Sequence, residues 1–404
     1  MSEAMPAIRL TPLVGMPVAE APVEIVERKG LGHPDTMCDA LAEALSQALC
    51  GYYLDHFGLI LHHNVDKALL WGGAAEPAFN GGRVTAPMEI FLAGRATHEF
   101  RGKQVPVEEL AQQSCRRWLR AHMHALDIER DVRIHTMIRP GSHDLVELYL
   151  RQQQSGVALA NDTSCGVGYA PLNELERLVL AVEQRLNDAG TRAAFPEIGE
   201  DIKLMALRRD DAVTLTVGCA FVDRFVTDFD DYQAKKARLA ARVHDIATQH
   251  TAQPVSVDVN TADGATPDSL FLTVTGTSAE AGDDGEVGRG NRSNGLITPY
   301  RPMNMEAVAG KNPVTHVGKL YNIIAGRVAE RIVERLPVAE AYCCLISRIG
   351  RPVHEPQVVE VRVRTRDTRP LTELDAPISA IVEHELHSVA AIQHELMNGR
   401  IRLY

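Results

Sequence analysis

The spacing of apolar residues along the chain predicts a series of helices. After His33, Met37, Leu41, Leu45 and Leu49 recur every four residues, which gives one buried helical face. Pro34 suits the first turn of this helix, because the N–H that proline lacks would have no partner there. Apolar patterns of this kind predict helices over residues 34–49, 107–125, 171–188, 229–249, 314–335 and 376–397.

Short apolar and β-branched runs predict strands between these helices. The turn Arg208-Arg209-Asp210-Asp211 is short and polar, so the strands on either side of such turns are expected to pair antiparallel. Pairs of strands alternate with single helices, which indicates an α+β fold with sheets covered by helices on one face. The predicted strands cover residues 59–63, 68–71, 88–94, 132–138, 145–151, 212–221, 255–260, 269–276, 341–349 and 358–364.

Length and charge narrow the class of protein. A chain of 404 residues should hold two or three domains, and residues 1–20 read as a poorly ordered lead. The net charge of −11 argues against nucleic-acid binding, which needs a basic face. It does not exclude ATP, because a local cluster of His, Lys and Arg can outweigh the global charge, and bound Mg²⁺ neutralises phosphate.

The cysteines and the apolar runs indicate a cytoplasmic protein. The seven cysteines are scattered and form no C-x-x-C pair, so we expect buried, reduced thiols. We find neither a signal-peptide pattern nor an apolar run of about 18 residues, and therefore expect no membrane span.

The segment 283–292 is the most informative stretch. It combines three acids, three glycines and two arginines. Carboxylates can hold Mg²⁺, arginines can grip phosphate, and glycines allow a close approach of the backbone, so the segment suits a magnesium–polyphosphate complex. The alternative is a solvated acidic turn. A Ca²⁺ loop of the EF-hand type is a poor match, because the acidic run is too short and too rich in arginine.

Three further segments lie at predicted helix starts. His33 stands at a helix N-terminus, which is a natural anion site, and Asp35 and Asp39 follow on the same face. The alternative is that His33 is a cap and that Asp35 only complements the helix dipole.

The loop 162–168 could bind a ribose or an adenine, although any loop-to-helix junction looks similar. It lacks the third glycine of a dinucleotide fingerprint. Lys311 and Lys319 flank a helix start, where the dipole disfavours cations, so they would be explained by an anionic ligand. The alternative is two ordinary surface lysines.

Together these segments resemble the archaeal-type S-adenosylmethionine synthetases (methionine adenosyltransferases), over residues from about Val23 to Tyr404. The motifs that carry the resemblance are ERKGLGHPDTMCD, NVDKALLWGG, NDTSCGVGYAP, GEDIKLMALR, VTGTSAEAGDDGEVGRGNRSNGLITPYRPMNMEA and GKNPVTHVGKLYN. The resemblance implies that the methionine sulfur attacks C5′ of ATP, and that the departing triphosphate is cleaved to phosphate and diphosphate.

The resemblance also implies roles for individual residues. His33, Lys203, Arg289 and Lys311 would contact the triphosphate, and Asp35 and Asp283 would hold Mg²⁺. The remaining candidates are Asp162, Gly166, Gly168, Asp283 and Arg292 for ATP, and Asp283, Glu76 and Lys319 for the methionine side. Asn64 and Asp66 fall where the better-known branch has a K⁺-binding glutamate, which leaves a K⁺ site open.

The family's architecture implies three similar α/β domains around a pseudo-threefold axis, with segments exchanged between them. We divide the chain into 21–140, 141–262 and 263–404. The resemblance also implies a homodimer with shared active sites. The strand 84–96 is nearly apolar on both faces, which requires a cover on each, either from a second subunit or from within the chain. The alternative functions are a paralogue that uses another nucleophile and a non-catalytic nucleotide-binding protein.

Overall fold

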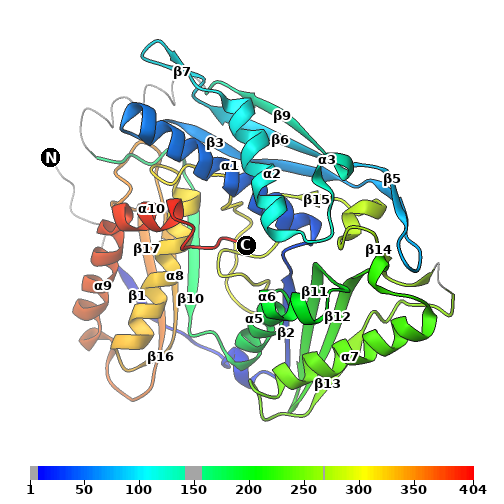
Figure 1. The fold of residues 1–404 in the computed structure, drawn as a ribbon. Coiled ribbons are helices and arrows are strands. Elements are labelled where there is room, and N and C mark those ends of the chain that lie inside the picture. Colours follow the sequence, from blue (N-terminus) through cyan, green and yellow to red (C-terminus); the bar gives the residue numbers. More distant parts are fainter. Residues whose placement is uncertain (1–7, 142–156, 267–268) are drawn as a thin grey trace.

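The computed structural model describes residues 8–141, 157–266 and 269–404. Three sheets dominate it, each backed by helices, and each sheet has its own hydrophobic cluster (Figure 1). The predicted α+β layering is therefore confirmed. None of the helices in these ranges is both long and apolar enough to cross a lipid bilayer.

The first sheet has the strand order β15-β3-β6-β9. Helix α1 and helix α2 pack on one face of it, and the predicted apolar face of α1 is fully buried there. The other face carries Leu69, Trp71 and Met137, which are 47%, 57% and 61% exposed. The elements are α1 (Pro34–Phe57), β3 (His63–Trp71), β6 (Met88–Ala96), α2 (Val107–His122), α3 (Ile128–Asp131), β9 (Val132–Arg139) and β15 (Gly285–Glu286), with the small hairpins β4 (Ala74–Glu76), β5 (Arg83–Ala86), β7 (Glu99–Phe100) and β8 (Lys103–Gln104).

The second sheet has the order β13-β12-β11-β2, with β14 paired to β12, and helices α5 and α7 pack against it. Strands β11 and β12 pair antiparallel through the turn at Asp210-Asp211, as the sequence predicts. The elements are β2 (Val23–Lys29), α5 (Glu174–Leu186), α6 (Ala189–Ala194), β11 (Ile198–Arg209), β12 (Ala212–Val222), α7 (Phe229–Ala247), β13 (Val255–Val259) and β14 (Leu272–Thr273).

The third sheet has the order β1-β17-β16-β10, so β1 from the start of the described chain pairs with β17 from its C-terminal part. Helix α8 packs across β10 and β16, and α9 packs on α8. The elements are β1 (Arg9–Pro12), β10 (Cys165–Ala170), α8 (Val317–Arg335), β16 (Val338–Ile346), β17 (Val358–Thr365), α9 (Asp375–His387) and α10 (Val389–Met397).

Several predicted elements need correction. The prediction that residues 1–20 form a poorly ordered lead is wrong for Arg9–Pro12, which form β1 and pair parallel with β17. Most of the run 59–63 is not a strand, because α1 continues to Phe57 and β3 begins at His63. The run 269–276 keeps only Leu272–Thr273 as a strand, and the helix predicted at 376–397 is interrupted at Ser388. The strand predicted at 145–151 lies outside the described residues.

Candidate functional site

The start of α1 forms the first part of the candidate site. His33 is the N-cap residue, and its Nδ1 accepts a hydrogen bond of 3.2 Å from the backbone N–H of Asp35. Asp35 Oδ2 lies 2.8 Å from Lys29 Nζ, and Oδ1 accepts a bond of 2.9 Å from the N–H of Glu286. Burial alone would raise the pKa of Asp35, but these two partners outweigh it and hold the pKa below its usual value. Asp35 is therefore ionised at neutral pH.

His33 lies in a charged neighbourhood that unites four of the predicted residues. Burial lowers the pKa of His33 to about 4. Within the same chain, the charges of Asp35 and Asp283 raise this pKa and the charge of Lys203 lowers it. Lys203 projects from β11 with its side chain 51% exposed, and its Nζ lies 3.5 Å from Glu27 Oε1. His33 Nδ1 lies 3.9 Å from Asp35 Oδ2, and Lys203 and Asp283 are near enough for their charges to change the pKa of His33; we call these four residues the first group.

Asp283 is held through a serine. Ser278 Oγ lies 3.0 Å from Asp283 Oδ2 and 2.6 Å from Asp201 Oδ2. Asp201 is buried, which raises its pKa to about 6. Asp283 itself is exposed, so its carboxylate is accessible to a ligand beside His33.

The loop that carries Arg289 is tied by its backbone to Lys29, the last residue of β2. Lys29 Nζ lies 3.0 Å from the carbonyl oxygen of Arg289, and the Arg289 side chain is exposed. The sequence predicts a nucleotide contact for Arg292, whereas in the structure its Nη2 donates to the carbonyls of Gly288 and Gly290, at 2.6 and 2.7 Å. Arg292 therefore closes the loop, and its nucleotide contact stays a prediction.

Lys311 lies in a second cluster of polar residues. Its Nζ is 2.7 Å from Asp66 Oδ2 and 2.7 Å from Glu306 Oε1. Ser164 Oγ donates to Glu306 Oε2 at 2.5 Å. The hydroxyl group of Ser347 lies within hydrogen-bond distance of two carbonyl oxygens, those of Ser164 and Asp162.

These bonds join the predicted Asp162 loop to Lys311. We call Lys311, Asp66, Glu306 and the Asp162 loop the second group.

Glu76 and Lys319 join neither group through the contacts found. Glu76 is in the exposed hairpin of β4 and β5 and pairs with Arg83. Lys319 is fully buried, and its Nζ lies 2.9 and 2.7 Å from the two carboxylate oxygens of Glu43. The anion that compensates Lys319 is therefore Glu43 of the same chain, and the substrate roles of Glu76 and Lys319 stay predictions.

Gly166 and Gly168 lie in strand β10, so the loop predicted over 162–168 ends before Cys165. A Cβ on Gly166 would lie 2.1 Å from the carbonyl carbon of Tyr321, and one on Gly168 would lie 2.2 Å from the backbone nitrogen of Gly326. Both glycines thus allow β10 to pack closely on α8, which accounts for them structurally. Their ATP contacts stay predictions.

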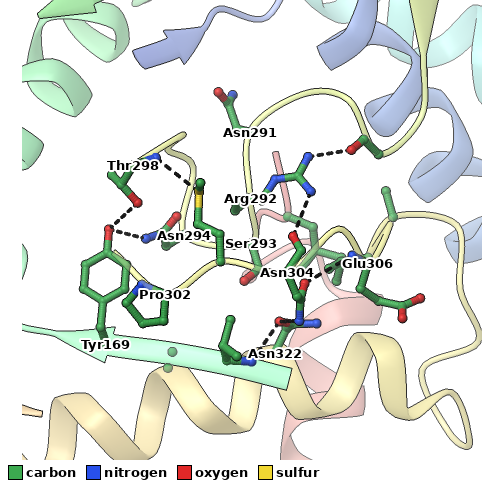
Figure 2. A pocket seen from close by; sticks show the side chains of 18 of the residues that line it. Tyr169, Asn291, Arg292, Ser293, Asn294, Thr298, Pro302, Asn304, Glu306 and Asn322 are labelled. Carbon is green, nitrogen blue, oxygen red and sulfur yellow. Dashed lines mark hydrogen bonds between the residues drawn. The ribbon is translucent and has the colours of Figure 1, made fainter. Parts of the chain in front are cut away.

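A cavity of about 180 Å³ lies behind the Arg289 loop, between that loop, β10 and α8 (Figure 2). Some hydrogen bonds there join lining residues to one another, as when Asn294 Nδ2 donates to Tyr169 and Asn304 Nδ2 donates to Asn322. Asp39 lines the cavity from α1, and burial raises its pKa to about 7.

Comparison with known proteins identifies the family. A model of the S-adenosylmethionine synthetase (AdoMet synthetase) family matches residues 6–400. The chain belongs to this family. The predicted resemblance is confirmed, and with it the assignment of the chain to the transferases that synthesise S-adenosylmethionine.

Individual members of the S-adenosylmethionine synthetase family align over almost their whole length. A probable S-adenosylmethionine synthase of Aquifex aeolicus is 52% identical over 98% of both chains. The S-adenosylmethionine synthase of Archaeoglobus fulgidus is 45% identical, over 99% of this chain and 100% of its own. A solved structure of an unusual S-adenosylmethionine synthetase from Campylobacter jejuni has the same fold, with a TM-score of 0.60 and 14% identity over 92% of this chain and 89% of that one.

Sequence reasoning missed several residues that organise the site. Lys29, Glu43 and Glu306 are bound to predicted site residues or to the loops that carry them. Glu43 follows Asp35 and Asp39 at intervals of four residues on a largely apolar helix, and this buried polar spacing is the signal that could have identified it.

Proposed function

We propose that the chain forms S-adenosylmethionine from ATP and L-methionine and releases phosphate and diphosphate. The observation that supports the proposal is the first group, in which the charges of Asp35, Asp283 and Lys203 act on the pKa of His33, in a member of this family. The methionine sulfur would use a lone pair to form a bond to C5′. The C5′–O bond would break, and its electron pair would leave with the triphosphate.

This reaction needs positive charge more than it needs a base. A thioether has no proton to lose, so the barrier lies in orienting the reactants and in stabilising the departing triphosphate. His33 is neutral before ATP arrives, and a bound polyphosphate would raise its pKa by attraction of opposite charges. Lys203, Arg289 and Lys311 would supply further positive charge to the triphosphate.

The negative charge of Asp35 and the exposed carboxylate of Asp283 favour Mg²⁺, which would replace the ammonium group of Lys29 beside Asp35 Oδ2. Asp35 is ionised, Asp283 is exposed, and both act on His33. Within the described ranges no group of three or more His, Cys, Asp or Glu residues could hold a metal ion by itself. This suits Mg²⁺, which binds through one or two carboxylates and completes its octahedron with water and phosphate oxygens. Bound Mg²⁺ would neutralise charge on the polyphosphate.

The residues at the predicted K⁺ position fit a monovalent cation poorly. The carboxylate of Asp66 is already shared by the ammonium groups of Lys67 and Lys311, each at 2.7 Å. The buried Oδ1 of Asn64 has no hydrogen-bond partner among the described residues, so one unused acceptor remains. A K⁺ ion stays an untested prediction.

We further propose that two copies of the chain share each active site. Within one chain, Lys311 pairs with Asp66 and Glu306 of the second group. The charges that act on the pKa of His33 include those of Asp283 and Lys203, which belong to the first group. The exposed apolar face of the first sheet offers a surface for the second copy, because Leu69, Trp71 and Met137 lie uncovered on it. The first group of one subunit and the second group of its partner would then form one site.

We also propose that the three sheets with their helices are similar domains around a pseudo-threefold axis. Strand β2 from the predicted N-terminal segment lies in the second sheet, and β1 lies in the third, which supports exchanged segments. The domain boundaries and the cytoplasmic location stay predictions.

The direct test is to incubate the purified protein with ATP, L-methionine and Mg²⁺. We expect S-adenosylmethionine, phosphate and diphosphate in equal amounts, measured by chromatography and phosphate assays. Omission of methionine serves as the control. Consumption of ATP only when another thioether or nucleophile replaces methionine would favour the paralogue, and binding of ATP without turnover would favour a non-catalytic protein.

A second test concerns the metal. Replacing Asp35 by asparagine should raise the Mg²⁺ concentration that gives half-maximal activity by about 10–100-fold, because the amide loses the charge that attracts the cation. The Mg²⁺ titration of initial rates measures this, with Asp55→Asn on the exposed end of α1 as the matched control. A titration that matches the unmodified protein would move the metal role to another carboxylate, such as Asp39.

A further inference from the structure

The buried face of α1 carries a row of carboxylates that the proposed reaction does not use fully. Asp35, Asp39 and Glu43 are spaced by four residues, so they lie one above another on the helix. They are 8%, 3% and 4% exposed. Buried carboxylates are costly unless hydrogen bonds or cations satisfy them, so their partners indicate what the row does.

Each carboxylate of the row accepts a backbone N–H from the long segment that carries the cationic residues. Glu286 N–H donates to Asp35 at 2.9 Å, and Gly288 N–H donates to Asp39 at 2.8 Å. Gly310 N–H, next to Lys311, donates to Glu43 at 2.9 Å. One helix face therefore sets the register of a chain segment that lies about 250 residues away in sequence.

The contact at Asp39 fixes the backbone on either side of Arg289. Gly288 precedes Arg289 and is held by Asp39 through its N–H and by Arg292 through its carbonyl oxygen. Gly290 follows Arg289, and a Cβ placed on it would lie 2.7 Å from Asp39 Oδ2. Asp39 thus touches the loop on both sides of Arg289 while Arg289 projects outward.

We propose that Asp39 is a positioning residue for Arg289: it sets where the Arg289 guanidinium points when the triphosphate is bound. This inference rests on the role proposed for Arg289. Displacement of a catalytic group by about 1 Å can cost on the order of 10²-fold in rate, so loss of the Asp39 contact should be visible in kcat.

The test compares Asp39→Ala with Asp39→Asn. The alanine variant loses the acceptor for Gly288 N–H, and we expect kcat to fall by about 10–100-fold with the KM for methionine changed by less than about threefold. The asparagine variant keeps a side-chain carbonyl oxygen in that place, and we expect it to recover most of kcat. Gly290→Ala pushes the loop away from an intact Asp39 and should lower kcat as Asp39→Ala does. It therefore tests the inference even if Asp39→Ala does not fold.

A double-mutant cycle separates positioning from a general loss of stability. If Asp39 acts through Arg289, then Asp39→Ala should lower kcat by less than about twofold further in an Arg289→Ala background. Equal losses in both backgrounds, or an asparagine variant as impaired as alanine, would overturn the inference. A normal kcat for the single variant Asp39→Ala would also overturn the inference.

The Arg289→Ala arm tests the underlying role by itself. If that variant keeps the unmodified kcat, the role proposed for Arg289 fails and the inference fails with it. If Arg289→Ala is impaired and both Asp39→Ala and Gly290→Ala are not, only the inference about Asp39 fails.

Discussion

Replacing Arg289 by leucine is expected to lower kcat for S-adenosylmethionine formation by about 10²–10³-fold, while the KM for methionine changes little. The charge on the triphosphate is most concentrated as the C5′–O bond breaks, so a preorganised guanidinium stabilises the transition state more than the bound substrates. The backbone of Arg289 is fixed by bonds from Lys29 and by its neighbours, so leucine should leave the loop in place.

Steady-state kinetics measure this effect, and Arg366→Leu on the exposed end of the third sheet provides the matched control. Hydrolysis of added triphosphate, assayed separately, should fall as well, because the same anion occupies the site. A kcat near that of the unmodified protein would remove Arg289 from the mechanism.

Mixing two inactive variants should restore activity when the altered residues belong to different groups of the site. His33→Asn retains a good N-cap residue but loses the imidazole, and Lys311→Gln removes a charge from the second group. After exchange of subunits, each mixed dimer would hold one site in which both residues are unaltered. Random exchange makes half of the dimers mixed, so we expect about a quarter of the unmodified activity.

The structure also supplies the negative control for this mixture. His33 and Lys203 both belong to the first group, in which the charge of Lys203 acts on the pKa of His33 within one chain, so a mixture of His33→Asn with Lys203→Gln should recover no activity. Mass spectrometry of differently tagged subunits confirms that exchange has occurred. Equal recovery by both mixtures, no recovery by either, or a fully active monomer would contradict the shared site.

The sequence predicts elements well where one apolar face repeats. The faces of α1, α5 and α8 are buried as the spacing indicates. The sequence predicts a strand before the turn at Asp210-Asp211 but not the bounds of β11. Its start, Gly199-Glu200-Asp201, is acidic, and those acids are buried by contacts with His124 and Ser278 that the local sequence does not reveal. Helix α9 ends before Ser388, and nothing in the apolar pattern marks that break.

For the site, the motifs identify which loops matter but not how they are supported. His33 and Asp35 could be named because they stand at a helix start after two glycines, and Asp283 because it opens a segment rich in acids, glycines and arginines, whereas Lys203 lies within strand β11 and was indicated only by the resemblance. The pairing of Lys319 with Glu43 could not be predicted, because the two residues are 276 positions apart and their match depends on how α8 lies relative to α1. Long-range partners of this kind decide whether a lysine faces a ligand or the protein interior.

The pairing of β1 with β17 has a consequence for how the protein is made. Arg9 pairs with Glu360, roughly 350 residues later, so at ribosomal rates of about 5–20 residues per second the first strand waits roughly 20–70 s for its partner. Strand β10 likewise waits for β16. Because non-local pairing is slow and leaves strand edges open, the third sheet should be the last to close on a nascent chain. A chain stalled before β16 would present β10 as an unpaired edge, which is the kind of surface that chaperones protect from aggregation.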